Sequence, residues 1–202
     1  MFRQLHRLCV AIFWLFWLGV GGLLYQHRAA FEPALDFARV CWDHDWRAPQ
    51  PLPEMAGHVT RVFNGASFQF RDSTGPLYNF GLAGVEAPRL SEPATLRQRR
   101  LFAQSARNLE KLLGGQSVRI AVALVRQETH TGLGLVWANQ TNINRRVIAE
   151  GEGSLDRGPV FRSLPLREAY ALVRAERRAR RRGVGLWSAP QQATQPLAER
   201  RP

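Results

Sequence analysis

The sequence predicts an α+β protein, mainly β, in which a five-stranded barrel carries about three helices and follows a single transmembrane helix. Three observations support this fold class. Short alternating apolar segments are separated by turn residues, longer segments have a helical period, and one uncharged apolar run lies near the N-terminus. The chain of 202 residues suits one folded domain with appendages.

The apolar run at residues 8–25 is long enough to cross a membrane. It carries no charged side chain, and its eighteen residues span about 27 Å as a helix, close to the thickness of a hydrocarbon core. We therefore expect residues 1–28 to be an uncleaved anchor of a single-pass membrane protein, with a cleaved signal peptide or a buried soluble helix as alternatives. Arg3 and Arg7 precede the run, which favours a domain on the non-cytoplasmic side. That side is the bacterial periplasm, with the mitochondrial inner membrane as the alternative.

Residues 29–56 form a connector between the anchor and the domain. Apolar residues recur in it with a helical period, and Pro33 is expected in the first turn of that helix. The proline-rich spacer at residues 48–53 marks the domain boundary. We place the folded domain at residues 57–188 and a disordered, polar tail at residues 189–202.

The domain alternates between strand-like and helix-like segments. Strands are expected in residues 57–72 (two strands), 76–85, 117–125 and 132–138, and helices in residues 96–113, 143–150 and 166–182. Asn64-Gly65 is a strong hairpin signal, because both residues accept a positive φ. Five short strands with these helical additions indicate a small closed barrel, an architecture that includes the OB type.

The excess positive charge lies in the domain. Residues 1–56 hold five basic and five acidic residues, so the net charge of +12 belongs to residues 57–202. Such a domain favours a polyanion, either nucleic acid or an anionic bilayer, although a solvated basic surface has the same composition. The last helix concentrates this charge in Arg174, Arg177, Arg178, Arg180, Arg181 and Arg182.

Several short motifs follow one another along the domain. They are V-x-N-G-x-S-F at 62–68, L-A-G-V-E-A-P at 82–88, the helix at 103–113, G-x-G-L-V at 132–136, I-N-x-x-V-I-x-x-G at 143–151 and A-E-x-x-A-R-x-x-x-x-G-L-W-S at 175–188. Their order and spacing resemble the staphylococcal nuclease-like, or thermonuclease, family over about residues 57–188. The resemblance implies an OB-type barrel that cuts DNA and RNA. It also implies one Ca²⁺ held by aspartates, two arginines on the phosphate and a glutamate as the proposed base.

Most of the polar residues that this family uses are replaced here. Ala66 stands where the resemblance implies the first calcium aspartate, and Glu86 where it implies the second. Gly81 and Leu133 occupy the positions where the resemblance implies the two phosphate-binding arginines, and Arg89 occupies the position of the glutamate base. A guanidinium stays protonated and cannot act as a base, but it can pair with Glu86 or bind a phosphate.

These replacements predict a catalytically degenerate member of the family. A lone carboxylate is a poor calcium site, because Ca²⁺ takes about six to eight oxygen ligands. Neither Gly81 nor Leu133 can neutralise charge in a phosphodiester transition state. We therefore expect no cofactor, with Ca²⁺ only if the domain is active. His130, near the family's active-site loop, is a candidate for a relocated base, although a surface histidine gives the same pattern.

The expected function is binding rather than hydrolysis. The candidate contacts for a polyanion are the six helix arginines and Arg89. A protein partner is a further candidate, and an active, membrane-anchored, Ca²⁺-dependent endonuclease is the alternative function. Phe68, Phe70 and Tyr78 suit either base stacking or the barrel core.

Overall fold

The computed structural model describes residues 14, 26, 28–90 and 93–188 of the chain. The chain divides into two compact units, Met1–Trp42 and Asp43–Pro202. The described part of the first unit is mainly the helix α2 (Arg28–Asp43). Pro33 was expected in its first turn and lies in its second, because the helix already runs from Arg28.

The expected anchor at residues 8–25 lies outside the described residues, apart from Trp14, and stays a prediction. Within the described part of the chain, no helix is both long enough and apolar enough to span a membrane. The expected tail at residues 189–202 also lies outside the described residues.

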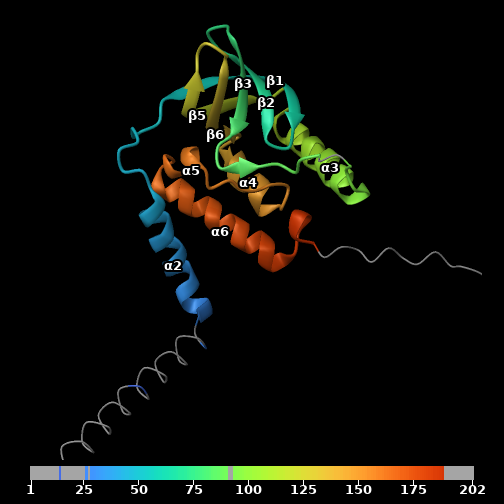
Figure 1. Ribbon diagram of the computed structural model, residues 1–202. Helices are drawn as coiled ribbons and strands as arrows, with labels where there is room; N and C mark the ends of the chain where they lie inside the picture. The colour runs from blue at the N-terminus through green and yellow to red at the C-terminus, as the bar shows by residue number, and fades with distance from the viewer. Residues whose placement is uncertain (1–13, 15–25, 27, 91–92, 189–202) are drawn as a thin grey trace, which may run out of the picture. The chain divides into compact units, whose positions relative to one another are not determined.

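Five strands of the second unit close into a barrel (Figure 1). The strands are β1 (Glu54–Asn64), β2 (Ser67–Asp72), β3 (Leu77–Leu82), β5 (Ser117–Arg126) and β6 (Thr131–Ala138). Neighbours pair antiparallel in the order β3-β2-β1-β5-β6, and a parallel pairing of β3 with β6 closes the barrel. The predicted α+β barrel of five strands is therefore confirmed. β1 begins three residues before residue 57, because Glu54 pairs with Ala121 and Met55 with Ile120.

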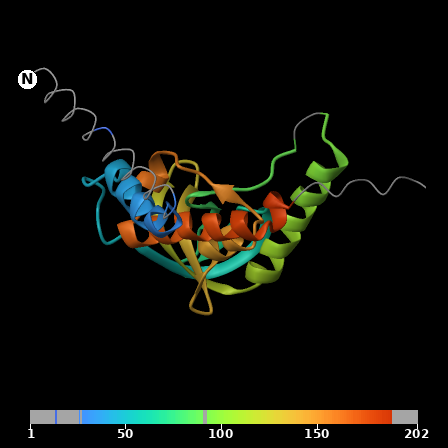
Figure 2. The ribbon, with the colours of Figure 1, turned by 90° about the horizontal axis from the view of Figure 1, so that it is seen from below.

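The remaining elements cover one end and one side of the barrel. They are β4 (Val85–Glu86), α3 (Leu96–Leu113), β7 (Thr141–Asn142), α4 (Ile143–Ala149), β8 (Ser154–Leu155), α5 (Pro159–Arg162), α6 (Leu166–Arg182) and η1 (Gly185–Trp187). The three predicted helices correspond to α3, α4 and α6. α4 contacts both β6 and α6, and Figure 2 shows α6 crossing the barrel end with α3 to one side. The two-residue strands β4, β7 and β8 were not predicted, because two residues cannot show an alternating pattern.

Aromatic side chains fill the middle of the barrel. Phe68, Phe70 and Phe80 are fully buried, and the Phe70 and Phe80 rings meet edge to face with centroids 5.7 Å apart. Tyr78 is also buried, and its hydroxyl donates to Oε1 of Gln127 over 3.2 Å. Of the two roles that the sequence leaves open for these aromatics, the structure shows barrel core.

α3 is fixed at its start and against the first hairpin. The Thr95 Oγ1 accepts a hydrogen bond from the Gln98 N–H over 3.2 Å, and the Thr95 N–H donates to Oε1 of Gln98 over 2.8 Å, a reciprocal cap. Farther along, Ser105 packs so closely on Gly65 that a Cβ on this glycine would lie 2.5 Å from its Oγ. The Asn64-Gly65 turn therefore serves as a docking point for α3, besides reversing the chain.

Asn144 joins three segments of the barrel end. It is fully buried at the start of α4. Its Oδ1 accepts from the Val136 N–H over 2.8 Å, and its Nδ2 donates to the carbonyls of Ala83 and Gly134 over 2.9 and 3.0 Å. Because these three hydrogen bonds reach both the turn after β3 and β6, this side chain holds the two segments together.

The parallel pairing that closes the barrel is tight at one position. Gly81 of β3 stands opposite Leu133 of β6. A Cβ on Gly81 would lie 2.6 Å from Cδ2 of Leu133, so the leucine side chain already occupies the space that a larger residue needs.

Replacing Asn144 is expected to lower the free energy of unfolding. Asn144→Ala leaves one buried N–H and two buried carbonyls without this partner, so we expect a loss of about 3 kcal/mol in urea denaturation. The matched control is Asn79→Ala, an exposed asparagine of β3, for which we expect a change within about 0.5 kcal/mol. Equal losses in the two variants would contradict this role of Asn144.

The contact between residues 81 and 133 is expected to appear as an energetic coupling. Gly81→Ala should destabilise the protein by about 1 kcal/mol, because the new Cβ displaces Leu133. In a Leu133→Ala background the same change should be neutral or stabilise by up to about 1 kcal/mol, because alanine orders strand backbone better than glycine. A double-mutant cycle of unfolding free energies measures the difference, and a coupling of zero would contradict the packing.

Candidate functional site

A pocket of about 580 Å³ opens beside the point where the barrel closes. It lies between the turn after β1, the end of β3, the loop after β4 and the helix α3. The five positions that the sequence singled out, Ala66, Gly81, Glu86, Arg89 and Leu133, all line it. Residues from four separate segments are therefore brought to one place by the closed barrel.

The inner part of the pocket carries no charge at these positions. Leu133 covers Gly81, so the two positions at which the resemblance implies arginines are filled by one apolar side chain. Both backbone polar groups of Ala66 form hydrogen bonds. Its N–H donates to Oδ1 of Asn64 over 2.9 Å, and its carbonyl accepts from Leu82 over 2.8 Å.

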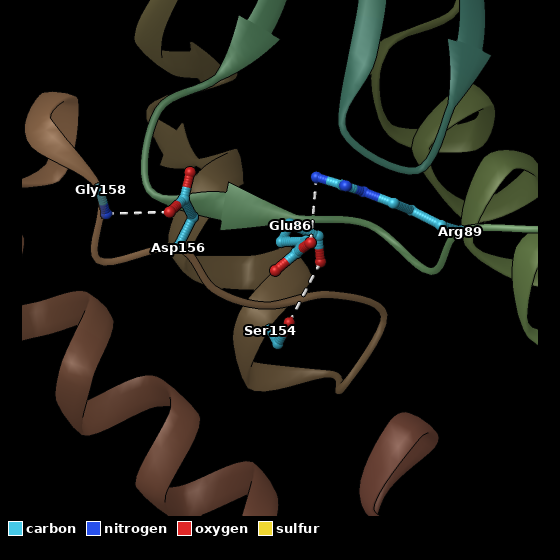
Figure 3. Close-up of polar contacts among 5 residues, drawn as sticks. All are labelled: Glu86, Arg89, Ser154, Asp156 and Gly158. Atoms are coloured by element: carbon cyan, nitrogen blue, oxygen red, sulfur yellow. Dashed lines mark hydrogen bonds and ion pairs between the residues drawn. The ribbon is translucent and has the colours of Figure 1, made fainter. Parts of the chain in front are cut away.

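The outer part of the pocket holds an ion pair (Figure 3). Nη2 of Arg89 lies 3.1 Å from Oε1 of Glu86, and the two side chains are 83% and 45% exposed. At such exposure, water screens the charges and the pair adds only about 0–1 kcal/mol to stability. Pairing with Glu86 is one of the two roles that the sequence left open to Arg89.

Asp156 is a second carboxylate in the pocket that the sequence analysis missed. It directly follows β8, which pairs with β4 and so runs beside Glu86 (Figure 3). Its backbone N–H donates to the Gly84 carbonyl over 3.1 Å, and its Oδ1 accepts from the Gly158 N–H over 2.9 Å. Asp-x-Gly is a turn signal that predicts the second contact. The β4–β8 pairing brings Asp156 to the pocket, and no local sequence pattern predicts this pairing because each strand has two residues.

The donors of this pocket do not fit a Ca²⁺ ion. Its two carboxylates are each engaged, Glu86 by a guanidinium and Asp156 by a backbone amide. Ca²⁺ takes about six to eight oxygens, with carboxylates supplying most of the affinity. Among the residues that the structure describes, no group of three or more His, Cys, Asp or Glu side chains is arranged to hold a metal ion.

His130 does not line the pocket. It lies in the turn before β6, is exposed and has a left-handed backbone with φ of 49°. Its ring lies against Tyr78, with centroids 5.3 Å apart, and its carbonyl accepts from Asn79 over 2.8 Å. Three residues along β6 separate it from Leu133, or about 10 Å, so the structure gives no support to His130 as a base at this site.

The predicted basic helix is α6, and its arginines have different surroundings. The helix buries one face, which includes Leu172, Glu176 and Ala179. Arg167, Arg174, Arg178 and Arg181 are exposed and recur at intervals of seven, four and three. At 100° per residue they form one stripe on the side of the helix opposite the buried face. Arg167, which was not among the candidate contacts, begins this stripe.

Other arginines of α6 take part in the fold. Nη2 of Arg180 lies 3.2 Å from Oε1 of Glu176, and its guanidinium lies over the Trp187 ring, 4.1 Å from the centroid. The same Glu176 oxygen accepts from the Leu155 N–H over 3.0 Å. Arg177 is half buried, and Arg182 is exposed beside the stripe. Arg180 therefore contributes to the attachment of α6 as well as to its charge.

A comparison with protein families agrees with these motifs. A family model described as "Staphylococcal nuclease homologue" matches residues 79–189, more than half of the chain. The match begins in β3, so it includes Gly81, Glu86, Arg89 and Leu133 and leaves out Ala66. No curated protein matches the sequence. With the barrel, the helices and the matched residues together, the chain belongs to the staphylococcal nuclease family.

Proposed function

We propose that this domain is a membrane-held, catalytically degenerate member of its family that binds nucleic acid by its phosphates, through α6, without hydrolysing it. One observation carries the proposal. In the pocket beside the barrel closure Leu133 covers Gly81, whereas four exposed arginines form a stripe along α6. The N-terminal segment at residues 8–25 supplies the membrane attachment in this proposal.

The argument against hydrolysis is electrostatic. Attack on a phosphodiester builds negative charge that donors or cations in the site must stabilise, and removal of one such donor commonly costs about 10²- to 10³-fold in rate. The side chains of Gly81 and Leu133 offer no hydrogen-bond donor to the pocket. Arg89 is a cation but pairs with Glu86, and a guanidinium cannot accept the proton of an attacking water.

The argument for phosphate binding rests on the spacing of the stripe. Arg174 and Arg178 are one helical turn apart, which separates their backbone positions by about 6 Å. Guanidinium groups at such intervals suit successive phosphates of a flexible strand, and their release of counterions makes binding depend on salt. Anionic lipid headgroups present the same chemistry, so they are an outcome of the test.

Neutralising the stripe is expected to weaken the salt dependence of binding. Arg167→Gln, Arg174→Gln and Arg178→Gln together should reduce the slope of log affinity against log salt by about two, since each contact with a single strand contributes about 0.7. Fluorescence anisotropy of a labelled oligonucleotide with the full chain in neutral detergent measures it. The matched control is the triple change of Arg99, Arg100 and Arg107 to Gln, three exposed arginines of α3. If this control lowers the slope as much, net charge rather than α6 carries binding.

The same oligonucleotide is expected to remain intact with Ca²⁺ and with a chelator, over times in which a family nuclease digests it. Gel electrophoresis of single- and double-stranded DNA and RNA measures this. Calcium-dependent cleavage would establish the alternative, an active endonuclease. Binding to vesicles of anionic lipid without binding to any nucleic acid would instead assign α6 to the membrane surface.

A further inference from the structure

A pocket of about 590 Å³ lies on the outer wall of the barrel and shares no lining residue with the pocket that holds Glu86 and Arg89. Residues of β6 line both pockets: Leu133 lines the pocket with Glu86 and Arg89, and Trp137 lines the outer pocket. The two residues are four positions apart along the strand, so their side chains point to the same face about 13 Å apart.

The floor of this outer pocket is a row of residues across three strands. Ala56 of β1 pairs with Arg119 of β5, and Arg119 pairs with Trp137 of β6. The small side chain of Ala56 leaves open space beside two large ones. The next outward pair, His58 and Ser117, is joined by a contact of 3.1 Å between Nδ1 and Oγ.

Arg119 and Trp137 form a preassembled stack. The Arg119 guanidinium lies over the indole ring, 4.5 Å from its centroid, and also pairs with the carboxylate of Glu54. The indole and the carboxylate together hold the guanidinium in place, and the Arg119 side chain remains half exposed at the pocket. The carboxylate offsets its charge, so the surface favours a flat, uncharged ring over a phosphate.

Two amide side chains stand at the rim. Asn139 and Gln140 are the central residues of the turn between β6 and β7, with φ of 47° and 64°. Positive φ at both positions defines a turn whose second residue is usually glycine, so a glutamine there is an unusual choice. Left-handed backbone in a non-glycine residue concentrates at functional sites. Each amide offers a donor and an acceptor, which is the pattern on the edge of a nucleobase.

We infer that this outer pocket binds one base of a single-stranded nucleic acid, stacked on Arg119 and Trp137 and bonded at its edge by Asn139 or Gln140. The inference rests on the proposed function, because the phosphates of the same strand lie along α6. A neighbouring pocket of about 610 Å³ connects the two surfaces, since its lining includes Arg119, Trp137 and Arg167. Arg167 is the first residue of the arginine stripe.

The test separates the base from the phosphates. The full chain in neutral detergent is titrated with labelled oligothymidylate and with an abasic deoxyribose-phosphate oligomer of the same length and charge. Trp137→Leu is expected to lower the affinity for oligothymidylate about tenfold and to leave the abasic oligomer unchanged. The matched control is Trp187→Leu, which removes another half-exposed indole covered by an arginine, outside this pocket. It should leave the ratio of the two affinities unaltered.

A second variant keeps the test decisive if Trp137→Leu does not fold. Gln140→Gly suits the positive φ of the turn, so the fold is retained while the amide is lost. We expect it to weaken oligothymidylate binding several-fold and to leave abasic binding unchanged. Circular dichroism confirms the fold of each variant.

The outcomes distinguish this inference from the proposed function. If both oligomers bind equally well, or if neither Trp137→Leu nor Gln140→Gly alters the preference for oligothymidylate, base binding at the outer pocket is contradicted and phosphate binding remains supported. If only oligothymidylate binds and Trp137→Leu abolishes that binding, base binding at the outer pocket is supported and phosphate binding by the arginine stripe is contradicted. If neither oligomer binds, both proposals fall.

Discussion

The barrel is closed by one parallel contact, and most of the remaining structure depends on it. Without the pairing of β3 with β6, the sheet would be an open ribbon and the turn after β3 would have no wall to rest on. The two strands can approach closely here because Gly81 has no side chain and Leu133 packs over it. Asn144 then ties the turn after β3 to β6. This tight contact is made by the two residues at which the family resemblance implies arginines.

The arginine stripe of α6 lies outside the pocket beside the barrel closure. Here the pocket has an apolar inner part and a self-neutralised rim, while α6 carries an exposed stripe of arginines on the far side of its buried face. Affinity for polyanions and the apparatus for hydrolysis are separate properties, because the first needs net positive potential and the second needs donors placed at one reacting group. The stripe on α6 bears on the first of these properties, and the pocket bears on the second.

Much of the fold could be predicted from the sequence because its signals are local. Alternation gave the five barrel strands, and the period of 3.6 with glycine stops gave α3, α4 and α6. What was missed depends on contacts between distant residues. Asp156 reaches the pocket through the β4–β8 pair, and Arg119 meets Trp137 only through the register of β5 with β6. The packing of Leu133 on Gly81 likewise requires a parallel pairing that no local pattern reveals. The membrane anchor stays a prediction.

Glu176 holds α6 in place by contacts within the domain itself. The positive charges of the α6 arginines repel one another. Glu176 offsets this repulsion by pairing with Arg180, and it also accepts a hydrogen bond from the Leu155 N–H of β8. Gly183 ends the helix with a left-handed cap. The helix that carries the arginine stripe is therefore held by contacts that need no bound polyanion. In the proposed function, association with a polyanion would require no folding of the helix, and diffusion in the electrostatic field of the domain would govern its rate.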